Sequence, residues 1–354
     1  MSEEITVDGS AEIANDNAPV QQIPIVDFSA WKIKGDLSSR MQVAREIADA
    51  CRKVGFVYIV NHTIPDSLID EAFQWSKQFF ALSDEDKMTA PHPDGWAVHR
   101  GYSWPDREKV SHITTEKDED QRAKIMEALE YKESYDMGSD KNSDQPNQWL
   151  PDEVLPGFRA FMTRFYWDCF SVTSDIMRAI AVGIGLEDED HLLKKHSGHN
   201  NQLRLLHYPK VPLEALERQT VSRMPAHSDW SSITILFQDD CGGLEAEDPS
   251  QPGRYIPATP LKNAIVMNVG DLLQMWSNDY LRSTNHRVTI PPLSTSLKGS
   301  DRMTRERYSI PYFIAPDPTA LIECLPACMS EENPPKHAPI TQVDYNRMRA
   351  SMLY

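Results

Sequence analysis

The side chains best placed to do chemistry are His227 and Asp229, which stand two residues apart. Residues two apart on a strand point to the same face, so an imidazole and a carboxylate can converge on one metal ion without backbone strain. A third ligand must come from another segment, and His286, in the predicted strand 283–290, is the best candidate. Two histidines and one carboxylate form the facial triad that suits non-haem Fe(II) with open coordination positions. The sequence therefore predicts an iron site made by these three residues.

A second pair of side chains, Arg307 and Ser309, indicates what would bind beside that metal. The two residues are again two apart on a predicted strand, and a guanidinium with a hydroxyl is a good receptor for a carboxylate. Such a receptor near a metal predicts a dicarboxylic co-substrate that chelates the metal through its other end. An H-x-D pair alone is common, and its histidine could be an ordinary hydrogen-bonded core residue, so the R-x-S pair is what favours catalysis.

The order H-x-D, distal His and R-x-S resembles the Fe(II)- and 2-oxoglutarate-dependent oxygenases, and more narrowly their isopenicillin N synthase-like branch. The resemblance is carried by residues 23–27, 55–58, 61–62, 204–209, 242–244 and 268–273. It implies an α+β fold with a double-stranded β-helix (jelly-roll) core flanked by α-helices. It also implies Fe(II) held by His227, Asp229 and His286, with 2-oxoglutarate held by Arg307, Ser309 and Tyr208, and O₂ as the second co-substrate.

The chemistry implied by this resemblance is oxidation of a C–H bond of a small molecule, with succinate and CO₂ as co-products. Hydroxylation, desaturation and ring closure all stay open. An alternative is an iron-dependent oxidase that does not use 2-oxoglutarate, as in isopenicillin N synthase, because R-x-S occurs there too. A non-catalytic jelly roll is a third possibility, which the complete set of three candidate ligands disfavours.

A narrower resemblance is to the fungal thymine-7-hydroxylases, through residues 100–103, 107–111, 132–135 and 177–183. It implies a substrate pocket lined by Asn201, Arg204, Trp230, Phe313 and Tyr102. The aromatic residue after the metal Asp is Tyr in that group and Trp230 here, so the substrate is open between a nucleobase and an intermediate of specialised metabolism. A structural ion pair for Arg204, and core packing for Trp230 and Phe313, are the competing interpretations.

Composition narrows the partners and the compartment. The 354 residues contain 36 Lys+Arg against 53 Asp+Glu, a formal net charge of −17. This excess of acid disfavours nucleic acid and anionic membrane surfaces as partners, because both are bound by clustered cations. Five cysteines, an acidic start and no apolar run of about 18 residues predict a cytoplasmic protein without a disulfide framework. Oligomeric state is left open.

The elements that must position these residues divide the chain into helices first and strands later. Helical spacing predicts helices at about 38–54, 66–79, 158–183 and 341–352, with one more possible at 116–131. Strands are predicted at 23–28, 56–60, 203–208, 221–227, 232–238, 243–247, 254–258, 264–269, 273–276, 283–290, 306–314 and 320–324. The predicted organisation is a disordered arm at 1–22 and one oxygenase domain at 23–354, comprising a helical half (23–200) with a lid region (about 84–150), a jelly-roll core (201–330) and the C-terminal helix (341–352).

Overall fold

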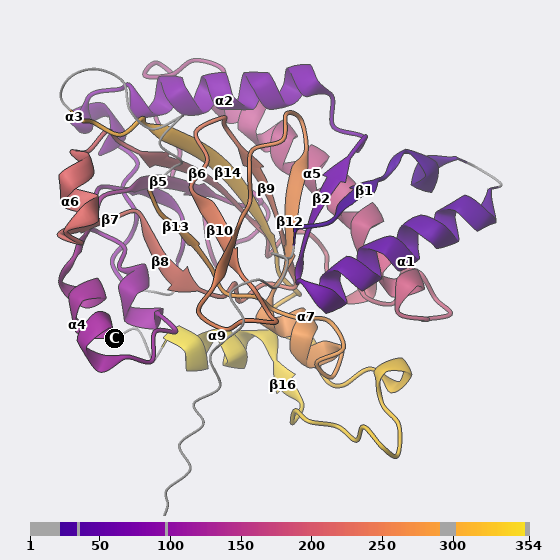
Figure 1. The fold of residues 1–354 in the computed structure, drawn as a ribbon. Helices are drawn as coiled ribbons and strands as arrows, with labels where there is room; N and C mark the ends of the chain where they lie inside the picture. The colour runs from indigo at the N-terminus through magenta and orange to yellow at the C-terminus, as the bar shows by residue number, and fades with distance from the viewer. Residues whose placement is uncertain (1–21, 34–35, 96–97, 291–301, 351–354) are drawn as a thin grey trace, which may run out of the picture.

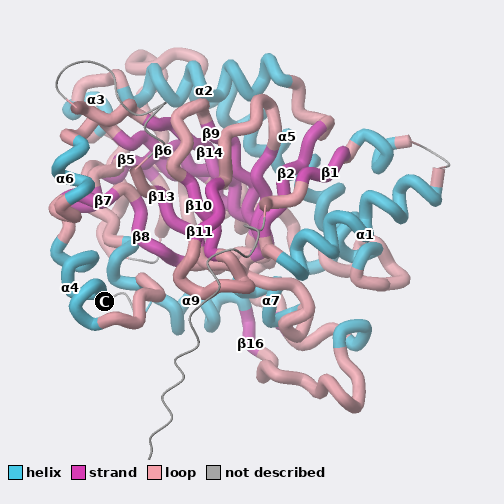
Figure 2. Tube along the Cα trace, viewed as in Figure 1, coloured by secondary structure: helices cyan, strands magenta, loops and turns pink. Residues whose placement is uncertain are grey.

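The computed structural model describes residues 22–33, 36–95, 98–290 and 302–350. The predicted arm at 1–22 lies outside these residues except for its last position. Within the described residues, strands gather at the centre and helices surround them (Figures 1 and 2). No described helix has both the length and the apolar character needed to cross a membrane.

Two sheets form the centre of the molecule. The large, mixed sheet has the order β1 (Ile25–Asp27), β2 (Phe56–Val60), β12 (Ile265–Val269), β9 (Ile233–Gln238), β14 (Arg307–Ile314), β6 (Gln202–Tyr208), β5 (Glu133–Met137) and β3 (Gly101–Ser103). The small sheet has the order β11 (Tyr255–Pro257), β10 (Leu244–Glu247), β13 (His286–Val288) and β8 (Met224–His227). Two short pairs are β15 (Leu321–Ile322) with β16 (Ile340–Thr341), and β4 (Leu129–Glu130) with β7 (Val221–Ser222).

Helices cover these strands, which confirms the predicted α+β class. They are α1 (Leu37–Lys53), α2 (Asp66–Phe80), α3 (Asp84–Lys87), α4 (Glu119–Glu127), α5 (Phe158–Gly183), α6 (Leu213–Glu217), α7 (Asp271–Trp276) and α9 (Gln342–Ala350), with the 3-10 turns η1 (Ser29–Lys32), η2 (Val110–Ile113), η3 (Leu193–Lys195) and η4 (Pro326–Cys328). The main core lies between α1, α2, α5 and one face of the large sheet. The helices expected from their spacing at 38–54, 66–79 and 158–183 are confirmed within a residue or two.

Strand pairing decides which residues share the other face of the large sheet. Arg307 pairs with Tyr208 and Ser309 with Leu206 between β14 and β6, with no break in register along β14. Alternate residues on one strand and directly paired residues on neighbouring strands point to the same side. Arg307, Ser309, Tyr208 and Leu206 therefore share one face, opposite to the face that packs on the helices.

Two segments differ from the sequence-based expectation. The segment 273–276, expected as a strand, belongs to helix α7, in which Leu272, Leu273 and Trp276 are buried at helical spacing. A short apolar run does not separate a strand from a helix by periodicity alone. Within the region 84–150, where the sequence predicts only a helix, β3 and β5 also extend the large sheet. The polar sequence of β5 hides this strand, because its charged side chains are buried through pairing.

Gly183, the last residue of α5, permits the close packing of that helix on α1. A methyl group at this position would lie 2.2 Å from the carbonyl oxygen of Ala44 and 2.7 Å from Cβ of Ala48. We expect Gly183→Ala to lower the free energy of unfolding by about 1–3 kcal/mol, because overpacking forces the backbone to shift. Chemical denaturation would measure this, with Arg164→Ala on the exposed side of α5 as the control, expected to change stability by about 0.5 kcal/mol or less. Equal stability of Gly183→Ala and the wild type would contradict the prediction.

Candidate active site

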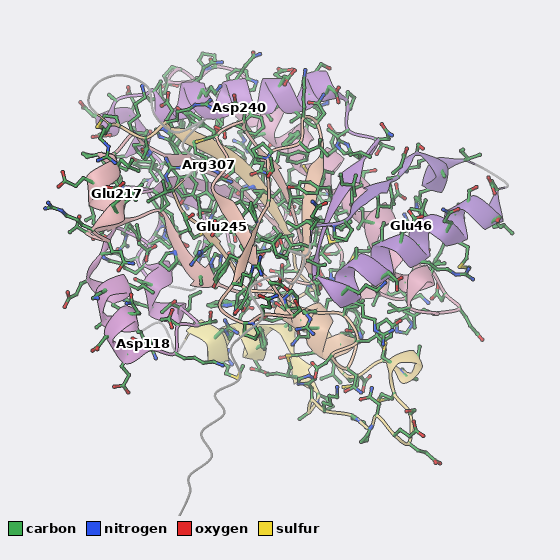
Figure 3. The ribbon with its side chains drawn as sticks, in the orientation of Figure 1. Glu46, Asp118, Glu217, Asp240, Glu245 and Arg307 are labelled. Atoms are coloured by element: carbon green, nitrogen blue, oxygen red, sulfur yellow. The ribbon has the colours of Figure 1, made fainter. Side chains whose placement is uncertain are left out.

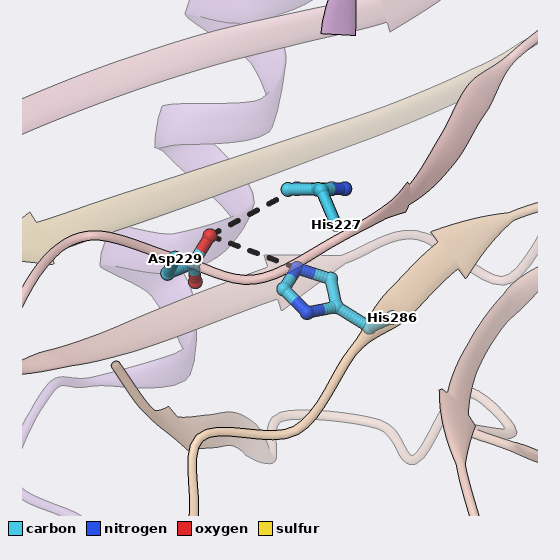
Figure 4. Close-up of side chains that lie close together, drawn as sticks. All are labelled: His227, Asp229 and His286. Carbon is cyan, nitrogen blue, oxygen red and sulfur yellow. Dashed lines mark ion pairs between the residues drawn. The ribbon is translucent and has the colours of Figure 1, made fainter. Parts of the chain in front are cut away.

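Two histidines from the small sheet meet one aspartate that is hydrogen-bonded to the large sheet (Figure 4). His227 ends β8 and pairs directly with His286 at the start of β13, while Asp229 follows β8 after one residue. Nε2 of His227 lies 3.9 Å from Oδ1 of Asp229, and Nε2 of His286 lies 3.7 Å from the same oxygen. One ligand atom from each of the three side chains lies within 4.8 Å of the others, and all three residues are buried.

Neighbouring groups fix the orientation of all three side chains. Nδ1 of His227 bonds the carbonyl oxygen of Pro225 at 2.9 Å, and Nδ1 of His286 bonds that of Thr284 at 3.2 Å. A carbonyl only accepts, so each Nδ1 carries a proton, and in the neutral imidazole that binds a metal each Nε2 then offers a lone pair. Both Nε2 atoms therefore face Asp229 in the form that binds a metal.

Hydrogen bonds also orient the carboxylate of Asp229. Its Oδ2 accepts hydrogen bonds from Oγ1 of Thr234 at 2.6 Å and from Nδ2 of Asn268 at 2.8 Å, which leaves Oδ1 facing the histidines. Burial alone would raise the pKa of Asp229, but His286, His227 and these two hydrogen bonds lower it below its ordinary value. Burial and the nearby His286 lower the pKa of His227 to about 4. A charged carboxylate and neutral imidazoles are the donor set that fits Fe(II).

Arg307 and Ser309 lie on the face of the large sheet that also carries Tyr208. Arg307 is buried, with 1% of its surface exposed. It lies among the central strands, whereas Asp118 and Glu217 lie at the periphery (Figure 3). Nη1 donates to Oγ of Ser309 at 2.9 Å, while Nε and Nη2 are buried without a hydrogen-bond partner in the described part of the chain. The guanidinium lies 5.1 Å from the ring centre of Tyr208. Unpaired donors in a buried cation fit an anionic ligand such as a carboxylate.

Arg204 lies on the same face, and acidic side chains surround it. Its Nε donates to Oδ1 of Asp136 at 2.6 Å, and Nη1 and Nη2 donate to the two carboxylate oxygens of Glu108, each at 3.0 Å. Asn201 is also engaged within the protein, since it donates to the hydroxyl of Tyr312 and accepts from a backbone N–H. The ion pair that competes with a substrate contact for Arg204 is therefore present, and a substrate contact by Arg204 or Asn201 stays a prediction.

Trp230 and Phe313 are linked to the aspartate through the chain and through strand pairing, respectively. Trp230 follows Asp229 directly, is half-buried, and has an indole N–H with no hydrogen-bond partner among the described residues. Phe313 pairs with Thr234 across β14 and β9, and Thr234 is one of the two donors to Asp229. Phe313 therefore neighbours a residue that orients the aspartate. Trp230 packs against the main core, and the guanidinium of Arg349 lies 5.2 Å from its ring centre, so a substrate contact by Trp230 stays a prediction.

Tyr102 lies elsewhere, which differs from the expectation that it lines the pocket. It pairs with Tyr135 on the face of the large sheet that packs on α2, and its hydroxyl donates to Glu133 at 2.6 Å. Phe79 of α2 contacts its ring. Resemblance over residues 100–103 says nothing about which face of β3 each residue takes, and strand pairing places Tyr102 on the helix side.

Sequence reasoning missed four polar residues around the site: Thr234, Asn268, Lys132 and Asp136. The first two orient Asp229, and Lys132 is buried with ion pairs to Glu108 and Glu130. Lys132 directly precedes β5 and Asp136 lies within it, and their even spacing is the signal that could have placed them on one face. The charged side chains of β5 concealed this signal, because a buried strand is usually recognised by its apolar residues.

Comparison with known proteins agrees with this geometry. Residues 23–153 match the family "non-haem dioxygenase in morphine synthesis N-terminal", and residues 199–316 match the "2OG-Fe(II) oxygenase superfamily". A 2-oxoglutarate-Fe(II) type oxidoreductase, ppzD of Metarhizium rileyi, is 36% identical over 338 residues, which are 95% of this chain and 92% of the relative. The proline hydroxylase buaE of Petromyces alliaceus is 40% identical, over 86% of this chain and 91% of its own.

A solved structure shows the same architecture over nearly the whole chain. The thymine-7-hydroxylase of Neurospora crassa in complex with alpha-KG superposes with a TM-score of 0.81 at 36% identity, covering 93% of this chain and 96% of that one. Its complex with alpha-KG and thymine gives a TM-score of 0.80 at 37% identity, with 94% and 97% covered. This chain belongs to the 2OG-Fe(II) oxygenase superfamily and is a 2-oxoglutarate- and Fe(II)-dependent dioxygenase related to that enzyme.

Proposed function

We propose that His227, Asp229 and His286 hold Fe(II), and that Arg307 and Ser309 bind the distal carboxylate of 2-oxoglutarate. The two sheets would form the walls of a double-stranded β-helix around this site. The observation that carries the proposal is the buried cluster in which both Nε2 atoms and one carboxylate oxygen face one another. The unpaired donors of Arg307 support the assignment of the co-substrate.

The protein's part in the reaction is to hold the reactants in place and to exclude water. When bound, Fe(II) and 2-oxoglutarate together supply the oxidant for a C–H bond, with succinate and CO₂ as co-products. Thr234 and Asn268 hold the metal-binding oxygen of Asp229 in position, and Ser309 fixes one edge of the guanidinium of Arg307. Burial of the cluster keeps the site dry, which strengthens each charge interaction within it.

We propose that the organic substrate binds at the end of the site marked by Trp230 and Phe313. Phe313 is four residues beyond Ser309 on β14, which at the rise of a strand is about 13 Å. The co-substrate end and the aromatic end are thus separated along one strand by roughly the length of a small molecule. The unpaired indole N–H of Trp230 offers a donor to a carbonyl or carboxylate of the substrate. β3 and β5 of the segment 84–150 belong to the large sheet, so closure over this end is proposed only for the described parts of the segment outside these strands.

The substrate is proposed to be a small molecule with a ring. The similar proteins include an enzyme named for proline hydroxylation and another solved with thymine bound, and both names point to small cyclic compounds. An intermediate of specialised metabolism and a nucleobase therefore stay the two candidate classes. We place the reaction in the cytoplasm, because a small and odd number of cysteines does not suit the disulfide framework of a secreted protein.

Coupled product analysis tests this function. The protein is mixed with Fe(II), 2-oxoglutarate, O₂ and either thymine or L-proline, and succinate and oxidised product are measured together. We expect substrate to stimulate succinate release, with one succinate for each oxidised product. Substrate oxidation and O₂ uptake without succinate would replace the proposal by the oxidase alternative. No product from either probe, with substrate-independent succinate still formed, would exclude these substrates and leave the co-substrate assignment in place.

A further inference from the structure

Arg223 is a second buried cation close to Arg307. The site described above gives no role to Arg223. It directly precedes β8, and 2% of its surface is exposed. Its Nη2 donates to the carbonyl oxygen of Arg305 at 2.6 Å, and its Nη1 lies 4.0 Å from Sγ of Cys241. Its Nε is buried without a hydrogen-bond partner in the described part of the chain.

The ring of Tyr208 stands next to both guanidinium groups. Arg307 lies 5.1 Å from the ring centre and Arg223 lies 5.8 Å from it. In the described residues, neither guanidinium has a carboxylate within ion-pair distance, although Arg204 has two. This end of the space between the sheets therefore holds two positive charges without an acidic partner.

Burying two cations side by side without a carboxylate partner lowers the stability of the fold. Removing a charge from water carries a penalty of several kcal/mol unless an opposite charge compensates for it. Burial lowers the pKa of Arg223, and the positive charge of Arg307 adds to this lowering, while the nearby sulfur of Cys241 opposes it. An arrangement of this kind is stable and useful when an anion occupies the place between or beside the two groups.

We propose that Arg223 is a positioning residue for the co-substrate, supplying a second positive charge that attracts the distal carboxylate of 2-oxoglutarate toward Arg307. The inference rests on the proposed function, since it assumes that Arg307 binds that carboxylate. Arg223 acts through space and through Tyr208, while Arg307 and Ser309 make the direct contacts. The second charge favours a dicarboxylic keto acid over a keto acid with one carboxylate.

A matched pair of variants separates charge from structure. Arg223→Gln removes the charge but keeps an N–H that can donate to the carbonyl oxygen of Arg305, while Arg223→Lys keeps the charge. Binding is measured by calorimetry on the Mn(II)-loaded protein without turnover. We expect Arg223→Gln to weaken 2-oxoglutarate binding by about tenfold and Arg223→Lys to stay within about threefold of the wild type. Thermal unfolding of both variants checks that the fold is intact.

A second ligand tests which end of the co-substrate is concerned. 2-Oxopentanoate has the same keto acid group but lacks the distal carboxylate, so its affinity should be equal for the wild type and Arg223→Gln. Equal weakening of both ligands would show a general structural defect and overturn the proposal, as would unchanged 2-oxoglutarate binding by Arg223→Gln. Arg307→Met provides the reference: if it also leaves 2-oxoglutarate binding unchanged, the proposed function fails, whereas loss of binding there alone refutes only the role of Arg223.

Discussion

Asp229→Asn is expected to lower turnover by more than about 10³-fold, although the substitution barely changes the shape of the side chain. Oδ2 of Asp229 accepts from Thr234 and Asn268, and only the amide oxygen of an asparagine can replace it there. The amide nitrogen must then take the place of Oδ1 and face the two imidazoles. An amide NH₂ offers no lone pair to a metal, so the hydrogen bonds that position the aspartate would hold the asparagine in the wrong orientation.

Direct metal binding is the decisive measurement for this variant. Calorimetric titration with Mn(II) in the absence of O₂ should show the affinity of Asp229→Asn falling by at least about 100-fold. Asp49→Asn makes the same chemical change at an exposed position of α1 and should bind the metal as the wild type does. Wild-type metal affinity in Asp229→Asn would mean that the cluster is not the metal site, even if activity were lost.

The parts of the site that could be predicted from sequence are those that depend on spacing within one strand. Arg307 and Ser309 are two apart in a strand whose register is unbroken, so their common face follows from the alternation of side chains. His286 could be proposed only as a distant candidate, because its meeting with His227 depends on the pairing of β13 with β8. The structure supplies that pairing, which no local pattern contains.

The parts that could not be predicted depend on partners far apart in the chain. Resemblance assigns Tyr102 to the pocket, but its face is fixed by pairing with Tyr135 on β5, a strand that the sequence conceals. The concealment is physical. Glu133 and Asp136 would exclude a buried strand if they stood alone, but Lys87 and Arg204 neutralise them from other segments. Charge pairing over long sequence distances thus hides the same strand that carries part of the site.

Arg307→Met is expected to change stability and co-substrate binding in opposite directions. The wild-type guanidinium is buried, bonded to Ser309 and stacked near Tyr208, but it has no acidic partner among the described residues. Replacing such a cation with an apolar side chain of similar length removes a desolvation cost. Without 2-oxoglutarate, we expect the free energy of unfolding of the variant to equal that of the wild type or to exceed it by about 1 kcal/mol.

Adding 2-oxoglutarate to the Mn(II)-loaded proteins should reverse this order. A ligand present at 100 times its dissociation constant stabilises the native state by about 2.7 kcal/mol, and the wild type should gain this amount. Arg307→Met should gain almost nothing at the same concentration, since its affinity is expected to fall by about 100-fold or more. Arg45→Met, at an exposed position of α1, should behave as the wild type does in both conditions. Thermal unfolding with and without 2-oxoglutarate gives both readings, and a variant that is less stable without ligand yet fully stabilised by it would contradict them. If the variant is at least as stable as the wild type without 2-oxoglutarate but less stable with it, the charge of Arg307 contributes to ligand binding and not to the stability of the fold.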